Sequence, residues 1–496
     1  MVCGTTSDAG KSHVVTGLCR LLSRRGVKVA PFKAQNMALN SYVTPSGHEI
    51  GRAQGVQALA AGVEPEVAMN PVLLKPTGER TSQVVVNGRP WKELDAAAYQ
   101  DAKRELFDIV TASLNELRSR FDVVVCEGAG SPAEINLLGH DIVNLPLAKR
   151  AGLPVVVVGD IDRGGVFASL FGTVELLPSD LRSQVRGFVV NKLRGDPALL
   201  GHGPDDLEQR TGVPVIGVLP YLHDVALDAE DSLALDGRRP RPIGDGDPLV
   251  DGLDVAVVRF PRIANFTDLD ALAIEPGVSV RYVTDGAGLG QPDLVVLPGT
   301  KATVADLEWT LGRGLDRAIA TAVDAGALVL GICGGYQMLG RTIVDEVESA
   351  RGVVNGLGWL AVDTVFEAGK TTRQRRGHSM GHRVTGYEIH HGNVSRAGPD
   401  VGWVHLDDAY GVDDEGTVDT DVAQFLGTSL HGLFESDGFR AAFLSEIARR
   451  RDKVFVPAGV SFAAAREAQF DRLADCIEAN VDIDRLTALI AEGAPV

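Results

Sequence analysis

The sequence predicts an α/β protein with two domains, each built around a parallel β-sheet. Short apolar runs that suit strands buried on both faces alternate with longer segments whose apolar residues follow helical spacing. Glycine makes up 57 of the 496 residues, as expected where many strands and helices are joined by tight corners. Residues 236–252 are rich in proline, glycine and charge and show no periodicity, so we expect a linker there.

Length and composition limit the functions open to the chain. With 496 residues, the chain is long enough for two or three domains, each with its own hydrophobic core. Lys and Arg number 48 against 66 Asp and Glu, and the net charge of −18 argues against a broad basic surface for nucleic acid. Five scattered cysteines without a Cys-x-x-Cys pair speak against a disulfide framework or a zinc site. With no apolar run of membrane-spanning length and no signal peptide, we expect a cytoplasmic protein that binds no membrane, in an oligomeric state left open.

The N-terminal domain opens with a glycine-rich loop at residues 4–12, Gly-Thr-Thr-Ser-Asp-Ala-Gly-Lys-Ser, with one residue more between its glycines than the common motif has. A short strand is expected before it and an amphipathic helix after it, which is the context of a phosphate-binding loop. Lys11 is then expected to meet the β- and γ-phosphates of ATP, and Ser12 to ligate Mg²⁺. Backbone groups of the loop would cradle the phosphates. The candidate positions are Thr6, Asp8, Ala9 and Gly10.

Polar residues follow the next predicted strands, at the sheet edge where ligand loops lie. Lys33 follows the strand at residues 27–32 and is a candidate for contact with a phosphate or a carboxylate; the alternative is a solvated loop lysine. Apolar residues follow helical spacing from Trp91 to Arg120, so we expect a helix there. Glu127 follows the next strand, at residues 121–126. Because an acidic residue at this edge faces the phosphate loop, we expect Glu127 to be a ligand of Mg²⁺ or to support one.

A third cluster follows the predicted strand at residues 153–158. Asp160, Asp162 and Arg163 lie beside paired glycines and suit contacts with a metal, a phosphate or a substrate carboxylate. The alternative is a structural turn held by salt bridges. Two further strands, at residues 187–192 and 214–220, complete the predicted sheet.

The C-terminal domain is organised around Cys333, which lies between a predicted buried strand at residues 327–330 and a helix. A residue at such a tight corner is pushed out of the end of the sheet, so Cys333 is placed as a nucleophile. The alternative is a small buried hydrophobic residue, the commonest role of a free cysteine.

Two further features favour the nucleophile. His431 follows a strand-like segment and precedes a glycine, where its imidazole is able to reach the thiol. Gly299 follows another predicted strand, at residues 293–297. Backbone N–H groups there and at Gly334 are expected to form an oxyanion hole.

These pieces resemble the class I glutamine amidotransferase domain, whose nucleophile elbow matches residues 331–339, Gly-Ile-Cys-Gly-Gly-Tyr-Gln-Met-Leu. The resemblance implies a flavodoxin-like fold, glutamine as the nitrogen donor and contact of Gln337 with that glutamine. Members of this family usually carry a glutamate two residues after the histidine, whereas this chain has Leu433. Glu435 lies two residues further on, so the expected third member of the triad is Glu435 or none.

The N-terminal loop resembles that of dethiobiotin synthetase and its relatives, which activate a carboxylate as an acyl phosphate. In that related fold an Asn-Lys pair at a strand end lies near the base, so the resemblance makes Asn191 an adenine-binding candidate.

Taken together, the chain resembles the cobyric acid synthase family. The matching segments occur in family order at residues 4–12, 33–37, 51–54, 127–136 and 159–167. The resemblance implies ATP, Mg²⁺ and glutamine as reactants and a corrinoid substrate. The implied reaction amidates the b, d, e and g carboxylates of adenosylcobyrinic acid a,c-diamide to give adenosylcobyric acid in cobalamin biosynthesis. The expected parts are a ligase domain at residues 1–235, a linker at 236–252, a glutaminase domain at 253–442 and a helical tail at 443–496.

Two other functions fit parts of the same pattern. Cobyrinic acid a,c-diamide synthase shares the two-domain organisation but amidates different carboxylates. A P-loop ATPase that acts as a switch, with a glutaminase-like domain used only for binding, would lack both glutaminase and acyl-phosphate chemistry.

Overall fold

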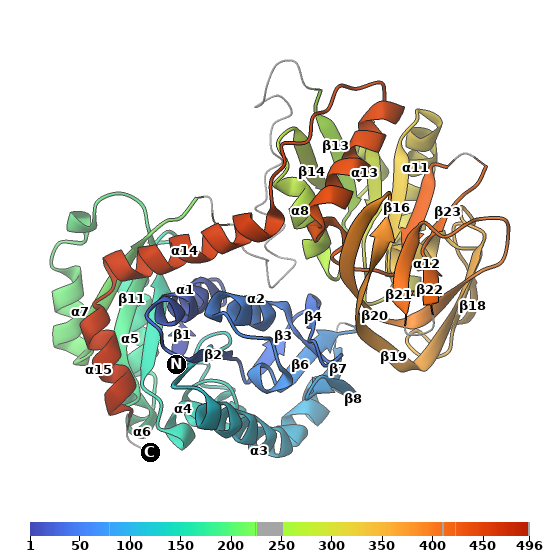
Figure 1. The fold of residues 1–496 in the computed structure, drawn as a ribbon. Coiled ribbons are helices and arrows are strands. Elements are labelled where there is room, and N and C mark those ends of the chain that lie inside the picture. Colours follow the sequence, from blue (N-terminus) through green and yellow to red (C-terminus); the bar gives the residue numbers. More distant parts are fainter. Residues whose placement is uncertain (79, 224, 226–250, 409–410, 422, 495–496) are drawn as a thin grey trace. The chain divides into compact units, whose positions relative to one another are not determined.

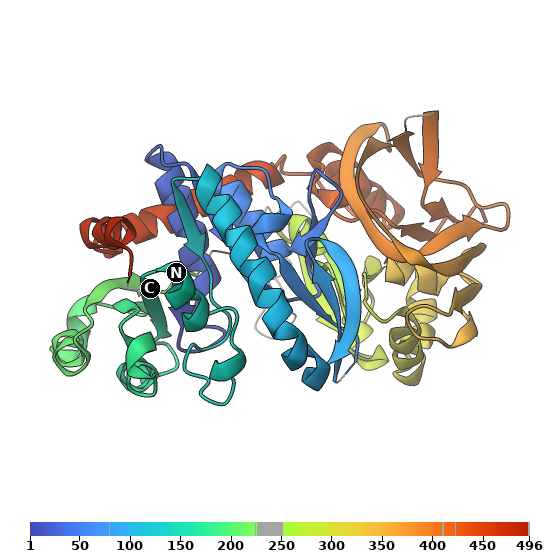
Figure 2. The same ribbon diagram turned by 90° about the horizontal axis from the view of Figure 1, so that it is seen from below.

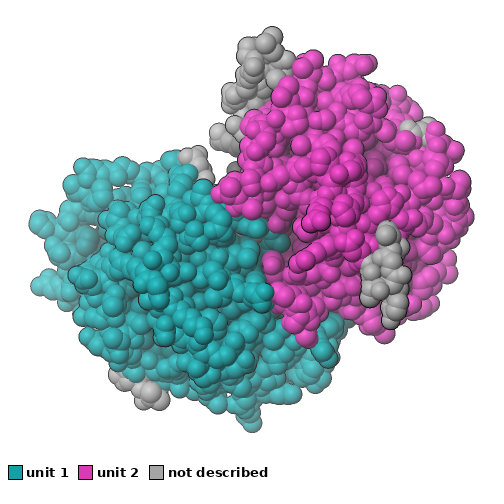
Figure 3. Space-filling model, in the orientation of Figure 1, with its two compact units in different colours: residues 1–37, 49–227, 466–496 teal, residues 38–48, 228–465 magenta. Residues whose placement is uncertain are grey.

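The computed structural model describes residues 1–78, 80–223, 225, 251–408, 411–421 and 423–494. The chain divides into two compact units (Figure 3). Unit 1 comprises Met1–Met37, Glu49–Leu227 and Arg466–Val496, and unit 2 comprises Ala38–His48 and Asp228–Ala465. The division differs from the expected boundaries because residues 38–48 belong to unit 2 and residues 466–496 to unit 1. Most of the predicted linker, residues 236–250, lies outside the described residues.

Unit 1 is built on a parallel sheet. Its strands pair in the order β1 (Val2–Gly4), β10 (Val155–Asp160), β11 (Val185–Leu193) and β12 (Val215–Pro220). A second parallel pair, β2 (Val29–Phe32) and β9 (Val123–Cys126), lies next to β1 through a bridge between Val2 and Glu127. Because all these strands run in parallel, the loop after β1, Lys33, Glu127 and Asp160 lie along one edge, as predicted.

Helices and a mixed sheet complete unit 1 (Figure 1). The shorter helices are α1 (Lys11–Arg24), α2 (Arg52–Ala61), α4 (Leu145–Ala151), α5 (Val166–Glu175), α6 (Ser179–Arg182) and α7 (Gly203–Thr211). The mixed sheet has the strand order β3 (Gln35–Met37), β6 (Val72–Pro76), β7 (Thr81–Val86) and β8 (Arg89–Asp95). The short strand β5 spans Glu49–Gly51.

The long helix α3 (Ala96–Arg120) begins later than its apolar spacing predicts. Helical spacing starts at Trp91, but the residues up to Asp95 form β8. The helix starts after Asp95, whose carboxylate accepts a hydrogen bond from Ala98 N (2.8 Å) and caps the first turn. In Figure 2, α3 is the long blue-green helix lying beside the blue strands.

Unit 2 is also built on a parallel sheet, which confirms the predicted fold class. The strand order is β14 (Val278–Val283), β13 (Leu253–Val258), β15 (Leu294–Leu297), β16 (Leu328–Ile332), β24 (Phe425–Thr428) and β23 (Thr417–Val418), and β23 is antiparallel to β24. Val255 and Val257 enter one hydrophobic core, and Ala256 and Val258 enter the other. Both faces are therefore covered, which is why such strands are continuous apolar runs.

The helices of unit 2 are mostly short. They are α8 (Asp270–Ala273), α9 (Gly286–Leu289), α10 (Thr303–Gly312), α11 (Leu315–Asp324), α12 (Gly334–Leu339) and α13 (Asp437–Arg450).

Between β16 and β24 the chain forms a second, mostly antiparallel sheet that sequence periodicity did not predict. Its strands are β17 (Thr342–Asp345), β18 (Gly352–Asn355), β19 (Val362–Ser379), β20 (His382–Arg396), β21 (Val404–Asp408) and β22 (Gly411–Glu415). The hairpin of β19 and β20 turns at Met380 and Gly381, both with positive φ (48° and 78°). Two positive-φ residues are typical of tight hairpin turns.

The helical tail expected at residues 443–496 is divided between the units. Helix α13 packs in unit 2, whereas α14 (Phe462–Asn480) enters unit 1 and α15 (Ile483–Glu492) lies within it. In unit 1, α14 packs closely on α1, because a Cβ on Gly17 would lie 2.6 Å from Ile477. Arg20 of α1 forms an ion pair with Asp471 (2.8 Å). Within the described ranges, none of the helices combines the length and the apolar character needed to cross a membrane.

Candidate functional site

Cys333 lies at the corner between β16 and α12, as predicted. Its backbone has φ 51° and ψ −107°, a conformation that residues other than glycine rarely adopt and that marks a strained nucleophile corner. Adjacent glycines make the corner possible: a Cβ on Gly335 would lie 1.9 Å from the carbonyl oxygen of Leu297. The thiol is buried, and its Sγ lies 3.9 Å from the carbonyl oxygen of Ile389.

The structure brings His431 to Cys333, as predicted. His431 follows β24, its imidazole is 1% exposed, and the neighbouring Cys333 helps to raise the pKa of the imidazole. The backbone N–H of His431 donates to Tyr387 O (2.8 Å), and Tyr387 N donates back to His431 O (3.0 Å). The Tyr387 ring also stacks on the imidazole, with centroids 5.3 Å apart and planes at 21°. Strand β20 therefore helps to hold the histidine in place.

The third charged member of this site is Asp268, where we had expected Glu435 or no residue. Oδ2 of Asp268 lies 2.7 Å from Nδ1 of His431, and Oδ1 accepts a hydrogen bond from Gly432 N (2.9 Å). Asp268 belongs to the short 3-10 helix Phe266–Leu269, in the loop after β13. The prediction was wrong because it considered only acidic residues that lie close to His431 along the chain. The available signal was an acidic residue after a parallel strand, at the same edge as Cys333.

The environment of His431 favours its protonated form. Burial by itself lowers the pKa of His431, but the charge of Asp268 and the hydrogen bonds to Asp268 and Cys333 outweigh it and raise the pKa to about 10. Because Asp268 occupies Nδ1, the nitrogen that exchanges a proton with the thiol is Nε2. Cys333, His431 and Asp268 thus form a chain of the type that activates a nucleophile.

Of the predicted oxyanion glycines, Gly299 lies in the segment after β15 and Gly334 is the first residue of α12. A Cβ on Gly299 would lie 2.9 Å from Ala264 O and 3.0 Å from Cε1 of His431, and one on Gly334 would lie 2.6 Å from Cγ2 of Thr300. Both positions therefore require glycine for close packing. Their role as oxyanion donors stays a prediction.

The side chain of Gln337 is held by protein groups. Its Oε1 accepts a hydrogen bond from Thr303 Oγ1 (3.1 Å), and its Nε2 donates to Gly392 O (3.3 Å). Gln337 therefore links α12 to α10 and β20, and its expected contact with glutamine stays a prediction.

The glycine-rich loop lies between β1 and α1, as a phosphate loop requires. Nζ of Lys11 donates to the carbonyl oxygens of Thr6 (2.8 Å), Ser7 (3.1 Å) and Gly130 (3.2 Å), so its charge faces the loop itself. Gly10 has φ 95°.

Asn191 supports this loop from β11. Its Nδ2 donates to Ala9 O (2.9 Å) and would lie 2.2 Å from a Cβ on Gly10. Contact of Asn191 with adenine stays a prediction.

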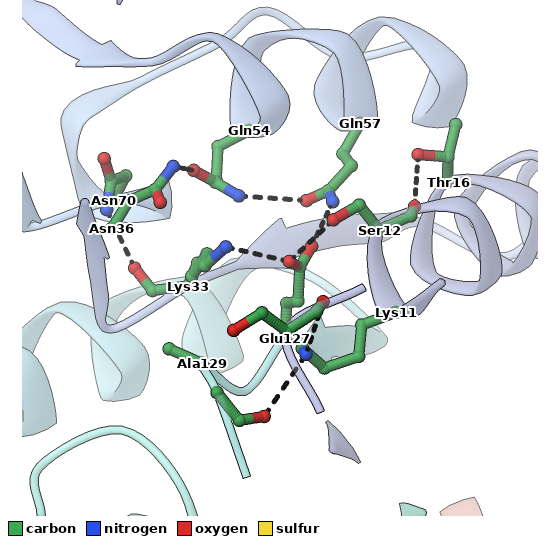
Figure 4. A network of polar contacts seen from close by, with 12 residues as sticks. Lys11, Ser12, Thr16, Lys33, Asn36, Gln54, Gln57, Asn70, Glu127 and Ala129 are labelled. Atoms are coloured by element: carbon green, nitrogen blue, oxygen red, sulfur yellow. Dashed lines mark hydrogen bonds and ion pairs between the residues drawn. The ribbon is translucent and has the colours of Figure 1, made fainter. Parts of the chain in front are cut away.

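Glu127 is the centre of a buried polar network (Figure 4). Its Oε1 accepts hydrogen bonds from Ser12 Oγ and Lys33 Nζ, both at 2.9 Å, and its Oε2 accepts one from Gln57 Nε2 at 2.5 Å. Burial by itself raises the pKa of Glu127, but the Lys33 ammonium and the bonds from Gln57 and Ser12 hold the pKa below its usual value. Lys33 is 4% exposed, so the alternative of a solvated loop lysine was wrong.

The third polar cluster is held together by ion pairs. Asp160 pairs with Lys192 (2.8 Å), and Asp162 pairs with Arg194 (2.6 Å). Arg163 pairs with Asp8 of the glycine-rich loop (3.1 Å). The structural-turn interpretation accounts for these contacts, and any contact of this cluster with a ligand stays a prediction.

Comparisons with known proteins match each of the two domains to a family. A protein-family model described as the CobQ/CobB/MinD/ParA nucleotide binding domain matches residues 1–234. A second family model, described as the CobB/CobQ-like glutamine amidotransferase domain, matches residues 254–439. The chain is 52% identical over 502 residues to a cobyric acid synthase of Rhodococcus jostii (strain RHA1), covering 100% of this chain and 96% of the relative. It is 53% identical over 503 residues to that of Saccharopolyspora erythraea, covering 100% and 95%. The chain therefore belongs to the cobyric acid synthase family.

Proposed function

We propose that this protein amidates the b, d, e and g carboxylates of adenosylcobyrinic acid a,c-diamide, using ATP and glutamine, and so forms adenosylcobyric acid in cobalamin biosynthesis. Identity of 52% along the whole chain to a relative named cobyric acid synthase supports this reaction. The observation that carries the proposal is the presence of two complementary sites in one chain. One is the Cys333–His431–Asp268 chain, and the other is the phosphate loop with Glu127 beside Ser12.

In the proposed glutaminase reaction, Cys333 attacks the side-chain amide carbon of glutamine. His431 takes the thiol proton through Nε2 and delivers it to the departing ammonia. Asp268 orients the imidazole and stabilises its positive charge. Water then hydrolyses the thioester and releases glutamate, while backbone N–H groups at Gly299 and Gly334 stabilise the oxyanions.

In the proposed ligase reaction, Lys11 and the loop backbone bind the phosphates of ATP. A carboxylate is a poor electrophile, so transfer of the γ-phosphoryl group to a corrinoid carboxylate creates an acyl phosphate with a good leaving group. Ammonia then displaces phosphate and forms the amide. Lys33 is placed beside Glu127 with its ammonium directed into the polar network, where it suits contact with an anionic reactant.

Mg²⁺ is the metal that these residues fit. Ser12 Oγ and a Glu127 carboxylate oxygen lie 2.9 Å apart beside the phosphate loop. Mg²⁺ is usually bound by one or two carboxylates together with substrate phosphates, and such a site needs no larger cluster of protein ligands. When bound, the ion would neutralise phosphate charge.

The test is incubation of the protein with the a,c-diamide, ATP, Mg²⁺ and glutamine, followed by mass analysis of the corrinoid. Four amidations are expected. Failure to amidate the a,c-diamide, together with two amidations of cobyrinic acid itself, would indicate the a,c-diamide synthase instead. Absence of both glutamate release and amidation would indicate a switch protein with a binding-only glutaminase-like domain.

A further inference from the structure

One segment of unit 2 is distant in sequence from the rest of that unit. We call Ala38–His48 the arm; it contains the short strand β4 (Ser41–Val43). Val43 packs in a hydrophobic cluster with Tyr387 and Ile389 of β20. Its carbonyl oxygen accepts a hydrogen bond from Gln374 Nε2 (2.9 Å). The arm therefore packs against the strand that lies beside the Cys333 thiol.

Both backbone groups of Ser41 are bound by residues that contact the catalytic histidine. Ser41 N donates to Oδ1 of Asn265 (2.8 Å), and Ser41 O accepts from the hydroxyl of Tyr387 (3.3 Å). Nδ2 of Asn265 lies 3.4 Å from Nε2 of His431, and the Tyr387 ring stacks on the same imidazole. Ser41 is fully buried. One residue of the arm thus connects Asn265, which faces Nε2 of the imidazole, with Tyr387, which stacks on the ring.

Ser41 also sets the orientation of the Asn265 amide. A backbone N–H only donates, so the group that faces Ser41 must be the amide oxygen of Asn265. The amide nitrogen is then the group directed at Nε2 of His431, the nitrogen that exchanges the proton with Cys333. An N–H at this position donates only to an unprotonated Nε2, so Asn265 favours the neutral imidazole and opposes Asp268, which favours the protonated ring.

Asn265 and Asp268 come from one turn and approach the two ring nitrogens of His431 from either side. Asn265 has φ 51° and ψ 35° and precedes the 3-10 helix Phe266–Leu269 that carries Asp268. Asn265 is 4% exposed and Asp268 is 5% exposed. Because the turn is short and buried, the bond from Ser41 to Asn265 also anchors the turn that carries the carboxylate.

We propose that Asn265 and Tyr387 are positioning residues for His431, and that the backbone N–H and C=O of Ser41 in the arm hold both in place. The glutaminase site is then completed by a segment from the N-terminal part of the sequence. This inference rests on the proposed glutaminase reaction.

The test uses the full-length protein and two substitutions that each remove one contact. Asn265→Gly deletes the amide and keeps the positive φ accessible. Tyr387→Phe removes the bond to Ser41 and keeps the stacked ring. The matched controls are Asn87→Gly, at another asparagine with positive φ (47°), and Tyr99→Phe, at another tyrosine whose hydroxyl donates a hydrogen bond, here to Gln35.

The readouts are glutamate release at saturating glutamine, KM for glutamine, and amidation driven by ammonium. We expect Asn265→Gly to lower kcat for glutamate release about tenfold to a hundredfold, with a smaller change in KM and unchanged ammonium-driven amidation. Tyr387→Phe should lower kcat by less. The double variant should lose less than the product of the two single losses, because both residues are held by the same residue, Ser41, and contact the same imidazole. Losses no larger than those of the controls, or losses that multiply, would overturn the proposal.

A third variant separates positioning from a general loss of structure. Asn265→Asp still accepts the bond from Ser41 but places a carboxylate oxygen opposite Nε2. The groups facing the imidazole would then be this new carboxylate, Asp268 and Cys333. The added negative charge should raise the pKa of His431, so the limb of the pH–rate profile that reports His431 should move to higher pH. An unchanged profile contradicts the inference. If the wild-type protein itself releases no glutamate, the proposed function fails instead.

Discussion

Oδ2 of Asp268 lies 2.7 Å from Nδ1 of His431, although 163 residues separate the two along the chain. The second oxygen of the same carboxylate is held by Gly432 N, so Asp268 has a single orientation toward the ring. This contact assigns Nδ1 to the carboxylate and leaves Nε2 for the thiol of Cys333. It therefore determines which tautomer of the neutral histidine is present.

Asp268→Asn is expected to impair glutamine hydrolysis strongly. The amide keeps the shape of the carboxylate but carries no charge, and it is able to favour the wrong tautomer of His431. We expect kcat for glutamate release to fall about a thousandfold or more, with ammonium-driven amidation retained. The control is Glu435→Gln, which should leave kcat within about twofold of the wild type. Equal losses in the two variants would contradict the assignment of Asp268.

Cys333→Ala separates the two proposed reactions. Without the thiol, no thioester forms, so glutamine-driven amidation and glutamate release should both fall below detection. Amidation with ammonium should continue at a rate close to that of the wild type, because the phosphate loop and Glu127 are unchanged. Corrinoid products are measured by mass and glutamate by a coupled assay. Loss of both activities in a folded variant would contradict separate sites.

The pH dependence of stability should report the contact between Asp268 and His431. The pKa of His431 is raised to about 10 in the folded protein, above an ordinary value of about 6.5. A raised histidine pKa contributes stability that is fully present below the unfolded pKa and is lost as the pH rises through the folded pKa. The stability advantage of the wild type over Asp268→Asn should therefore be largest below about pH 6.5 and decline toward pH 10. Urea unfolding across this range measures it, and a constant difference would refute the shift.

Glu127→Gln should destabilise unit 1. The substitution leaves the Lys33 ammonium, which is 4% exposed, without its carboxylate. Breaking a buried ion pair by removing one partner costs about 3–5 kcal/mol of the free energy of unfolding. The control is Asp162→Asn, which breaks a more exposed pair with Arg194 and should not measurably shift the urea midpoint. Similar midpoints for the two variants would show that the Glu127 network contributes little.

Much of the two sites is predictable because their residues are neighbours along the chain. The loop at residues 4–12 and the elbow around Cys333 are each contained in nine residues, and their spacing carries the chemistry. Glu127 is found because it directly follows a strand that is recognisable as an apolar run, and His431 because it lies between a strand-like segment and a glycine. Apolar spacing failed at Trp91, where the chain forms a strand although its residues continue a helical pattern, because pairing with β7 outweighs local preference.

Periodicity and motif spacing act over a few neighbouring residues, so the sequence was enough to predict the fold class, the glycine-rich loop between a strand and a helix, and the corner that carries Cys333. Three features became visible only in the folded chain: Asp268 rather than Glu435 faces His431, the arm belongs to unit 2, and the tail is divided between the units. The physical reason is that contacts between distant residues depend on the order and register of the intervening strands. That order places the loops after β13 and β24 at the same edge of one parallel sheet.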